Sequence, residues 1–247
     1  MGTTNYVSLS LATALQRSLD IAAHNMANAS TAGYKATHPL MEAVDPTNSG
    51  DATQAVNYVR DKGVYVDATQ GALVPTGNPL DVAVSGTAWL GFEAEGGQAA
   101  YGRDGRLAVD NEGRLVTMSG AAIVDVSGAP ITIPSDAGPS ITIASDGTIT
   151  DRQGATIGRI GMFDVPQIDK MTALGNGLFV PAADAGAAQP SENSKIAQGY
   201  TEQSNVKPVV EMIHLMDIQR AYERAVKMMD DENDLTKQAI QRLGRVV

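Results

Sequence analysis

The residues best suited to catalysis or metal binding are few in this chain and widely spaced. Its histidines, His24, His38 and His214, lie far apart, and none forms the His-x-x-x-His pair that places two imidazoles on one helix face. There are no cysteines, which excludes disulfides and zinc–thiolate sites. We therefore expect the histidines to be structural or surface residues, with no metal ion bound.

Six of the aspartates could in principle be calcium ligands. No stretch has the Asp-x-Asp-x-Asp-Gly spacing of a calcium loop, and turn formation accounts better for them. The phosphate-binding P-loop, the dinucleotide motif Gly-x-Gly-x-x-Gly and the nucleophile motif Gly-x-Ser-x-Gly do not occur either. The sequence thus predicts no enzyme, no catalytic residue, no cofactor and no small-molecule substrate. These aspartates are Asp45, Asp51, Asp104, Asp110, Asp146 and Asp151.

Composition narrows the class of protein further. The 247 residues are 43% hydrophobic, so the chain can bury a core, and 4% aromatic, so that core is mainly aliphatic. A net charge of −10 without a Lys/Arg cluster argues against nucleic acid and against anionic membranes as partners. No apolar run approaches the roughly 20 residues that span a bilayer. The start lacks the pattern of a secretory signal, so we expect a protein that stays in the cytoplasm or is exported without cleavage.

Both ends of the chain have helical periodicity. The runs Leu9 to about Ala29 and Pro208 to about Leu243 each carry one narrow apolar stripe, which is typical of a coiled-coil seam. A start near Ser8 or Ser10 is predicted for the first helix. A helix lying on a membrane would need several basic residues on its polar face, and the first run has only Arg17. We expect the stripes to form an antiparallel helix pair and subunit contacts; they contain Leu11, Leu15, Leu19, Ala22 and Met26, and Met212, Met216, Gln219, Tyr222, Val226 and Met229.

Between the helices, the pattern has a period of two. Short β-branched runs at roughly ten-residue spacing predict an antiparallel β sandwich or barrel-like domain over residues 76–190. Tight turns are expected at Asp104-Gly105, Asp146-Gly147 and Gln153-Gly154. The predicted fold class is therefore α+β. Its parts are an N-terminal helix in 1–35, an extended linker in 36–75, the β domain in 76–190, a return linker in 191–204 and a C-terminal helix in 205–247.

Two terminal motifs resemble those of bacterial flagellar rod and hook proteins. Leu19 to Lys35 is similar to the family's N-terminal signature, Asn-Leu-Ala-Asn-x-x-Thr-x-Gly-Phe-Lys, and Glu202 to Met212 with Gln219 to Glu223 is similar to its C-terminal signature. The middle motifs Asn78 to Val84 and Tyr101 to Gly105 agree as well. The matching signature residues are Asn25, Asn28, Gly33, Tyr34, Lys35, Ser204, Asn205, Val206, Arg220, Ala221 and Tyr222.

The resemblance implies a structural subunit of the flagellar basal-body rod. Its implied partners are further copies of itself, other proximal and distal rod proteins, and the type III export apparatus. It also implies assembly into a hollow periplasmic drive shaft. Because helices that cannot bury an apolar face are marginal in water, we expect the terminal helices to order on joining the rod. Length and a short linker favour a proximal over a distal rod member. A free-standing β-rich binding protein with a helical dimerisation stalk is the alternative of a different class.

One local departure concerns the start of the C-terminal helix. Many relatives have Asn or Asp at the position of Lys207 and an acidic residue at that of Val210, which together would cap the helix. Here the cap must come from Ser204 or Asn205, or be weak, a difference of about 1 kcal/mol. Pro208 still suits the first helical turn.

Overall fold

The computed structural model describes residues 2–44, 58–94, 96–134, 141–182 and 184–244. The chain divides into two compact units. The helical unit comprises Met1–Ala27, Thr37–Tyr65 and Lys207–Val247, and the β unit comprises Asn28–Ala36 and Val66–Val206. Each unit thus combines segments that are distant in the sequence. The described helices contain no segment long and apolar enough to cross a membrane.

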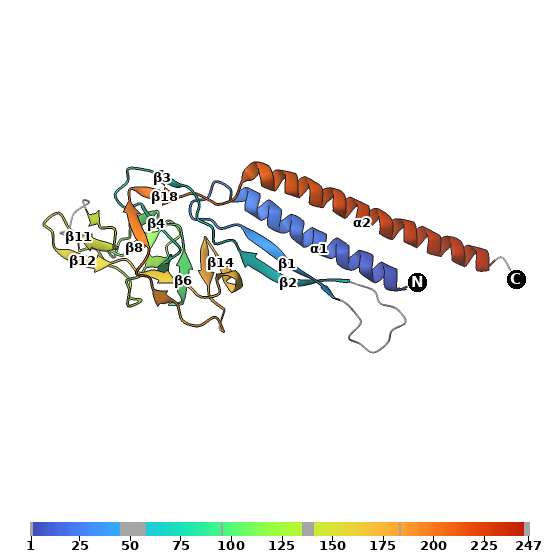
Figure 1. The fold of residues 1–247 in the computed structure, drawn as a ribbon, viewed down its shortest axis with the longest axis horizontal. Helices are drawn as coiled ribbons and strands as arrows, with labels where there is room; N and C mark the ends of the chain where they lie inside the picture. Colours follow the sequence, from blue (N-terminus) through green and yellow to red (C-terminus); the bar gives the residue numbers. More distant parts are fainter. Residues whose placement is uncertain (1, 45–57, 95, 135–140, 183, 245–247) are drawn as a thin grey trace. The chain divides into compact units, whose positions relative to one another are not determined.

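The helical unit is built on α1 (Gly2–Ala27) and α2 (Pro208–Leu243), which lie side by side and run in opposite directions (Figure 1). Strands β1 (Thr37–Val44) and β2 (Tyr58–Val66) pair in a two-stranded sheet, and β1 contacts α1. The C-terminal helix has the predicted bounds. The first helix begins earlier than predicted.

The early start of α1 has a local explanation in Ser10. Its hydroxyl donates to the carbonyl of Val7 at 2.8 Å. A serine that bonds backwards to a carbonyl in this way belongs to a helix interior, whereas an N-cap serine accepts from a later N–H. Ser8 is also buried within the helix. Neither serine therefore starts the helix.

The β unit consists of short antiparallel strands. A nine-stranded sheet is accompanied by a three-stranded sheet, β10-β11-β12, and by the two-stranded pairs β17-β4 and β18-β3. No closed barrel is found among the described residues, so the barrel-like alternative is wrong. The strands are β3 (Leu73–Pro75), β4 (Val82–Ser85), β5 (Trp89–Glu93), β6 (Ala99–Gly102), β7 (Leu107–Val109), β8 (Leu115–Thr117), β9 (Ala122–Ile123), β10 (Thr142–Ile143), β11 (Thr148–Thr150), β12 (Thr156–Arg159), β13 (Met162–Asp164), β14 (Thr172–Gly175), β15 (Leu178–Val180), β16 (Gln189–Pro190), β17 (Lys195–Gln198) and β18 (Tyr200–Glu202), with a 3-10 turn, η2 (Ile168–Lys170).

Two of the three predicted tight turns are present. Gly147 and Gly154, both with φ near +90°, lie between β10, β11 and β12 in succession. The prediction of a tight turn at Asp104-Gly105 is wrong. Gly105 has no positive φ and instead approaches β4 so closely that a Cβ there would overlap the backbone of Val82. This glycine is needed for close packing between chain segments, not for a reversal of the chain.

The segments expected to be linkers contain strands. Within 36–75 the structure places β1, β2 and β3; residues 45–57 lie outside the described range. Within 191–204, β17 pairs with β4 and β18 pairs with β3. The chain thus returns through strand pairing, which fixes the backbone that leads into the C-terminal motif.

An aliphatic cluster forms the main core of the β unit, as the low aromatic content predicts. Leu90, Ile123, Ile149 and Ile160 are fully buried in it. A smaller cluster surrounds Trp89, whose ring meets Phe179 edge to face at 5.6 Å. Together these clusters give the β unit its own hydrophobic interior.

Candidate functional site: buried polar joints between the two ends of the chain

The two terminal motifs meet inside the β unit. The backbone N–H of Asn205 donates to the carbonyl of Tyr34 at 3.4 Å, and the N–H of Ala36 donates to the Asn205 side-chain oxygen at 2.7 Å. Tyr34, Ala36 and Val206 form a small buried apolar cluster beside these bonds. Residues about 170 positions apart are therefore joined by both hydrogen bonds and apolar contact.

A buried ion-pair network lies next to this junction. The Glu202 carboxylate, at the end of β18, accepts from Lys35 Nζ at 2.6 Å and from Arg103 Nη1 at 3.0 Å. All three side chains are at most 1% exposed. Lys35 also donates to the Thr69 carbonyl at 2.7 Å, and Arg103 Nη2 donates to the Gly86 carbonyl at 2.8 Å. We call Lys35, Arg103 and Glu202 the buried triad; it connects one residue of each terminal motif with the middle motif.

The electrostatics of the buried triad make Glu202 its critical member. Two cations share a single carboxylate, which accepts a further bond from the Gly71 N–H at 2.9 Å. Burial lowers the pKa of Lys35 below its ordinary 10.5, and the nearby Glu202 carboxylate opposes that shift. Burial also lowers the pKa of Arg103, but a guanidinium stays protonated, and this one lies 5.4 Å from the centre of the Trp89 ring. Loss of the carboxylate would leave buried positive charge uncompensated.

Gly33 shows why the N-terminal motif contains a glycine. Its φ is +68°, a backbone conformation that L side chains rarely adopt. A Cβ at this position would overlap the backbone of Arg103 and Asp104. The Gly33 N–H donates to the Glu202 carbonyl at 2.7 Å. Glycine at this position therefore lets the backbone bond to Glu202 while it lies directly against the backbone of Arg103 and Asp104.

A second polar joint lies in the helical unit and is centred on Asn25, which is 1% exposed. Its side-chain N–H₂ donates to the Thr37 carbonyl at 2.8 Å and to Glu211 Oε1 at 2.9 Å, and its oxygen accepts from the Thr37 N–H at 3.0 Å. One amide thus connects the end of α1, the start of β1 and the first turn of α2. The Glu211 carboxylate is also favoured electrostatically by its place near a helix N-terminus.

Neither residue proposed as a cap for α2 performs that role. The Ser204 hydroxyl accepts from the Val206 N–H at 3.2 Å, and Asn205 is engaged with Ala36. The N-cap position is Lys207, which makes no side-chain capping bond. The structure agrees with the weak-cap alternative, because the available polar side chains are used to join the two terminal motifs.

The face of α2 that meets α1 has a regular heptad spacing. Buried and half-buried positions recur at intervals of four and three residues along the helix, and α1 is the element that lies against α2. We call this set the α1-facing stripe; it comprises Glu211, Leu215, Ile218, Tyr222, Ala225, Met229, Glu232, Thr236 and Ala239.

The interface residues expected on α2 divide between two faces. Tyr222 and Met229 belong to the α1-facing stripe. Met212, Met216 and Gln219 are exposed, and each follows a stripe residue by one position, about 100° around the helix. Val226 is half-buried. On α1, Ala22 is buried, Leu15, Leu19 and Met26 are half-buried, and Leu11 is exposed.

The remaining signature residues are less enclosed. Asn28 accepts from the Thr31 hydroxyl at 3.2 Å, Arg220 is exposed and Ala221 is half-buried. Three residues that carry the joints, Arg103, Glu202 and Glu211, were absent from the predicted site set. A sequence signal existed, because each is a charged residue inside one of the matching motifs; which charges pair could not be deduced without the fold.

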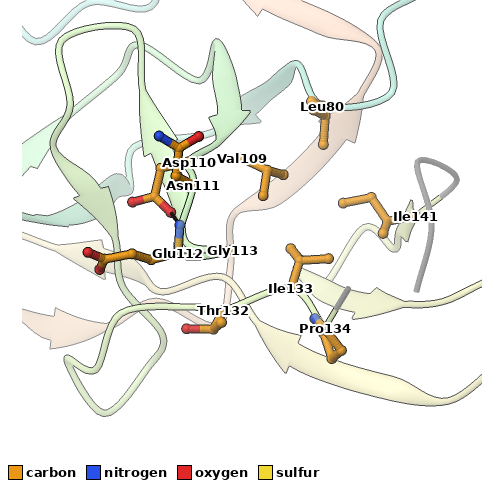
Figure 2. Close-up of a pocket in the computed structure, with 10 residues that line it drawn as sticks. All are labelled: Leu80, Val109, Asp110, Asn111, Glu112, Gly113, Thr132, Ile133, Pro134 and Ile141. Atoms are coloured by element: carbon orange, nitrogen blue, oxygen red, sulfur yellow. Dashed lines mark hydrogen bonds between the residues drawn. The ribbon is translucent and has the colours of Figure 1, made fainter. Parts of the chain in front are cut away.

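A cleft on the β unit shows no catalytic arrangement among its described residues. It encloses about 660 Å³ and has an apolar wall that includes Leu80, Val109 and Ile133, facing the loop from Asp110 to Gly113 (Figure 2). Oδ1 of Asp110 accepts from the backbone N–H groups of Glu112 and Arg114, as expected of an aspartate in a turn.

The described residues offer no metal centre. No three His, Cys, Asp or Glu side chains among them gather as metal ligands. His24 and His214 are exposed, and His38 packs against Tyr65 with ring centroids 5.3 Å apart. The buried residues Asn25, Lys35, Arg103 and Glu202 instead connect segments that are distant in the sequence.

Three family models match the parts that these joints connect. The flagella basal body rod protein model covers residues 6–35, the flagellar hook protein FlgE/F/G D1 domain model covers 83–151, and the flagellar basal body rod FlgEFG protein C-terminal model covers 197–242. The flagellar basal-body rod protein FlgF of Caulobacter vibrioides is 39% identical over 98% of both chains. The chain belongs to the flagellar basal-body rod protein family.

Comparison with further rod proteins shows which members of the family the chain is more similar to. FlgF of Mesorhizobium japonicum is 34% identical over 97% of both chains, whereas FlgG of Agrobacterium fabrum is 31% identical over 90% of this chain. The greater likeness to FlgF confirms the predicted preference for a proximal rod member. As a member of the rod protein family, the chain is a structural subunit of the flagellar basal body, and the buried triad lies where parts covered by the family models meet.

Proposed function

We propose that this rod protein self-assembles through its terminal helices into the hollow periplasmic shaft that transmits torque. The observation that carries the proposal is the uncovered apolar surface at the start of α2. Five apolar side chains there are between 42% and 72% exposed, far more than a helix packed on its own core would leave uncovered. They are Val209, Val210, Met212, Ile213 and Met216.

In this proposal the two helices pair as an antiparallel coiled coil, and the uncovered faces contact neighbouring subunits. Contacts between different faces of successive copies are heterologous and extend without closing, which is the geometry of a filament. The sheets of the β unit pack as a sandwich that stiffens the shaft. The partners are further copies, other proximal and distal rod proteins, and the type III export apparatus that delivers the chain. The role is mechanical and involves no catalysis.

The proposal is tested by placing a charge in the exposed apolar surface. Met216 is 42% exposed, so Met216→Asp costs the isolated monomer little but places a carboxylate in the proposed subunit contact. Met118→Asp is the matched control, because Met118 is 72% exposed on the β unit. Each variant is expressed as the sole copy in the bacterium that carries the gene, and swimming and the amount of the protein in purified basal bodies are measured.

We expect Met216→Asp to abolish incorporation and swimming, while Met118→Asp swims normally and both proteins melt at the wild-type temperature. Leu15→Asp combined with Met216→Asp should block incorporation in the same way. A Met216→Asp strain that assembles and swims like the control would overturn the proposal. A wild-type chain that forms only closed dimers and never enters basal bodies would favour the binding protein with a helical stalk.

A further inference from the structure

The β unit is completed by the part of it that is synthesised last. Residues 195–206, which we call the closing segment, contain β17 and β18 and end where the β unit ends. β17 pairs with β4, and β18 pairs with β3; both partners precede the nine-stranded sheet in the sequence (Figure 1). Each pair is a two-stranded sheet, so β3 and β4 have no other partner among the described strands. The early strands therefore depend on the last ones.

The strand that β17 completes lies in the interior. Val82, Ala83 and Val84 of β4 are at most 1% exposed, and both valines belong to the main core. Ile196 of the closing segment is 4% exposed and belongs to the same core. Without β17, backbone groups of this buried strand would lose hydrogen-bond partners that water cannot replace. The main core thus needs the closing segment for apolar contact and for backbone hydrogen bonds.

The buried charges place a second requirement on the order of folding. Glu202 lies in the closing segment, whereas Lys35 and Arg103 are synthesised long before it. Until the Glu202 carboxylate is present, burial of either cation would leave its charge in the interior without a counter-ion. The Gly33 N–H also waits for its acceptor, the Glu202 carbonyl. The N-terminal and middle motifs can therefore reach their final places only when the closing segment exists.

We propose that the β unit becomes stable only after the chain has been synthesised through Val206, so that its folding follows synthesis. Domains generally fold as units during synthesis, those nearest the N-terminus first. Here residues 28–201 lack the last strand and the shared counter-ion for as long as they are being made. The consequence for export rests on the proposed function: a growing chain without a stable β unit remains unfolded for delivery.

Hydrogen exchange of the purified 247-residue chain tests the thermodynamic basis of this proposal. If the β unit is unstable without the closing segment, β17 and β18 cannot open while the other strands stay folded. Amides of β17, β18 and the central strand β5 should then exchange through one opening, with the same dependence on urea, when peptides are resolved by mass spectrometry. Exchange of β17 and β18 at low urea, with β5 still protected, would overturn the proposal.

Two matched substitutions sharpen this measurement. Ile196→Val removes one buried methylene from the closing segment, and Ile123→Val removes one from β9 of the nine-stranded sheet; neither isoleucine is more than 4% exposed. We expect each variant to lower the protection of β5 several-fold, because both positions contribute to one cooperative unit. If Ile196→Val lowers protection in β17 and β18 alone, the closing segment is a separate layer and the proposal is wrong.

Synchronised translation of the natural gene in a reconstituted system tests the order of events directly. Protease is added at successive times, and the surviving fragments are identified by mass. We expect a protease-resistant β unit only from chains that extend beyond Val206. Resistant fragments that contain β4 to β9 from chains ending before Glu202 would refute the proposal. Neither experiment involves assembly, so absence of the wild-type chain from basal bodies would defeat the proposed function and leave this order of folding intact.

Discussion

The two units of this chain bury very different kinds of surface. The β unit encloses an aliphatic core and three charged side chains that are at most 1% exposed. In contrast, the 36 residues of α2 include only Glu211, Ile218 and Ala225 as buried residues. The β unit is thus complete within one chain, whereas the helical unit leaves most of its surface for other contacts. A folded unit and an assembly unit are combined in one polypeptide, and each terminal motif contributes residues to both.

Glu202→Gln gives the sharpest test of this contrast, with the largest expected effect. The substitution keeps the shape of the side chain but leaves Lys35 and Arg103 buried without their counter-ion. We expect the free energy of unfolding of the β unit to fall by about 3–5 kcal/mol, measured by urea denaturation followed through the fluorescence of Trp89. Glu112→Gln, whose side chain is 73% exposed, is the control and should be near neutral. Equal effects of the two variants would mean that the buried triad does not hold the β unit together.

Gly33→Ala tests the close approach of the N-terminal motif to the middle motif. Gly77→Ala is a matched control, because Gly77 has a similar φ of +75° but no atom within 4 Å of the position of its Cβ. Both variants carry the backbone cost of a positive φ, of order 1–3 kcal/mol. Only Gly33→Ala must also displace the backbone at Asp104, so we expect it to lower the melting temperature further than Gly77→Ala. Equal melting temperatures would show that the contact relaxes without cost.

Asn25→Ala carries the comparison into the helical unit. It removes the bonds to Thr37 and Glu211 and leaves the partly buried backbone N–H of Thr37 without its acceptor, at a cost of about 1 kcal/mol. We expect faster hydrogen exchange in α1 and the first turns of α2, with no change in the β unit. Asn233→Ala, at an exposed position of α2, is the control. Faster exchange in the β unit as well would show that the two units do not unfold separately.

The sequence predicted elements better than connections, for physical reasons that these residues illustrate. The bounds of α2 follow from Pro208 and from periodicity, which are local properties. The exposure of Met212 and Met216 was not foreseeable, because an apolar stripe looks the same whether it faces α1 or another subunit. The pairing of Lys35 with Glu202 depends on strand register across 167 residues. Both residues lie in motifs that the sequence shares with the family, but only the fold shows that Lys35 pairs with the Glu202 carboxylate.

The smallest predicted effect concerns acid stability and the turn between β10 and β11. Hydrogen bonds from the backbone N–H and hydroxyl of Thr148 hold the pKa of Asp146 below its ordinary 3.8. A depressed carboxyl pKa stabilises the fold above the unfolded pKa, and this contribution is lost as pH falls through the folded pKa, below about pH 4. Asp146→Asn should therefore lower the melting temperature slightly at neutral pH, and its difference from wild type should shrink in acid. Asp164→Asn is the control, because that exposed carboxylate bonds to no described residue. A difference that stays constant down to about pH 3 would show that the charge of Asp146 contributes nothing and that the turn depends on hydrogen-bond geometry alone.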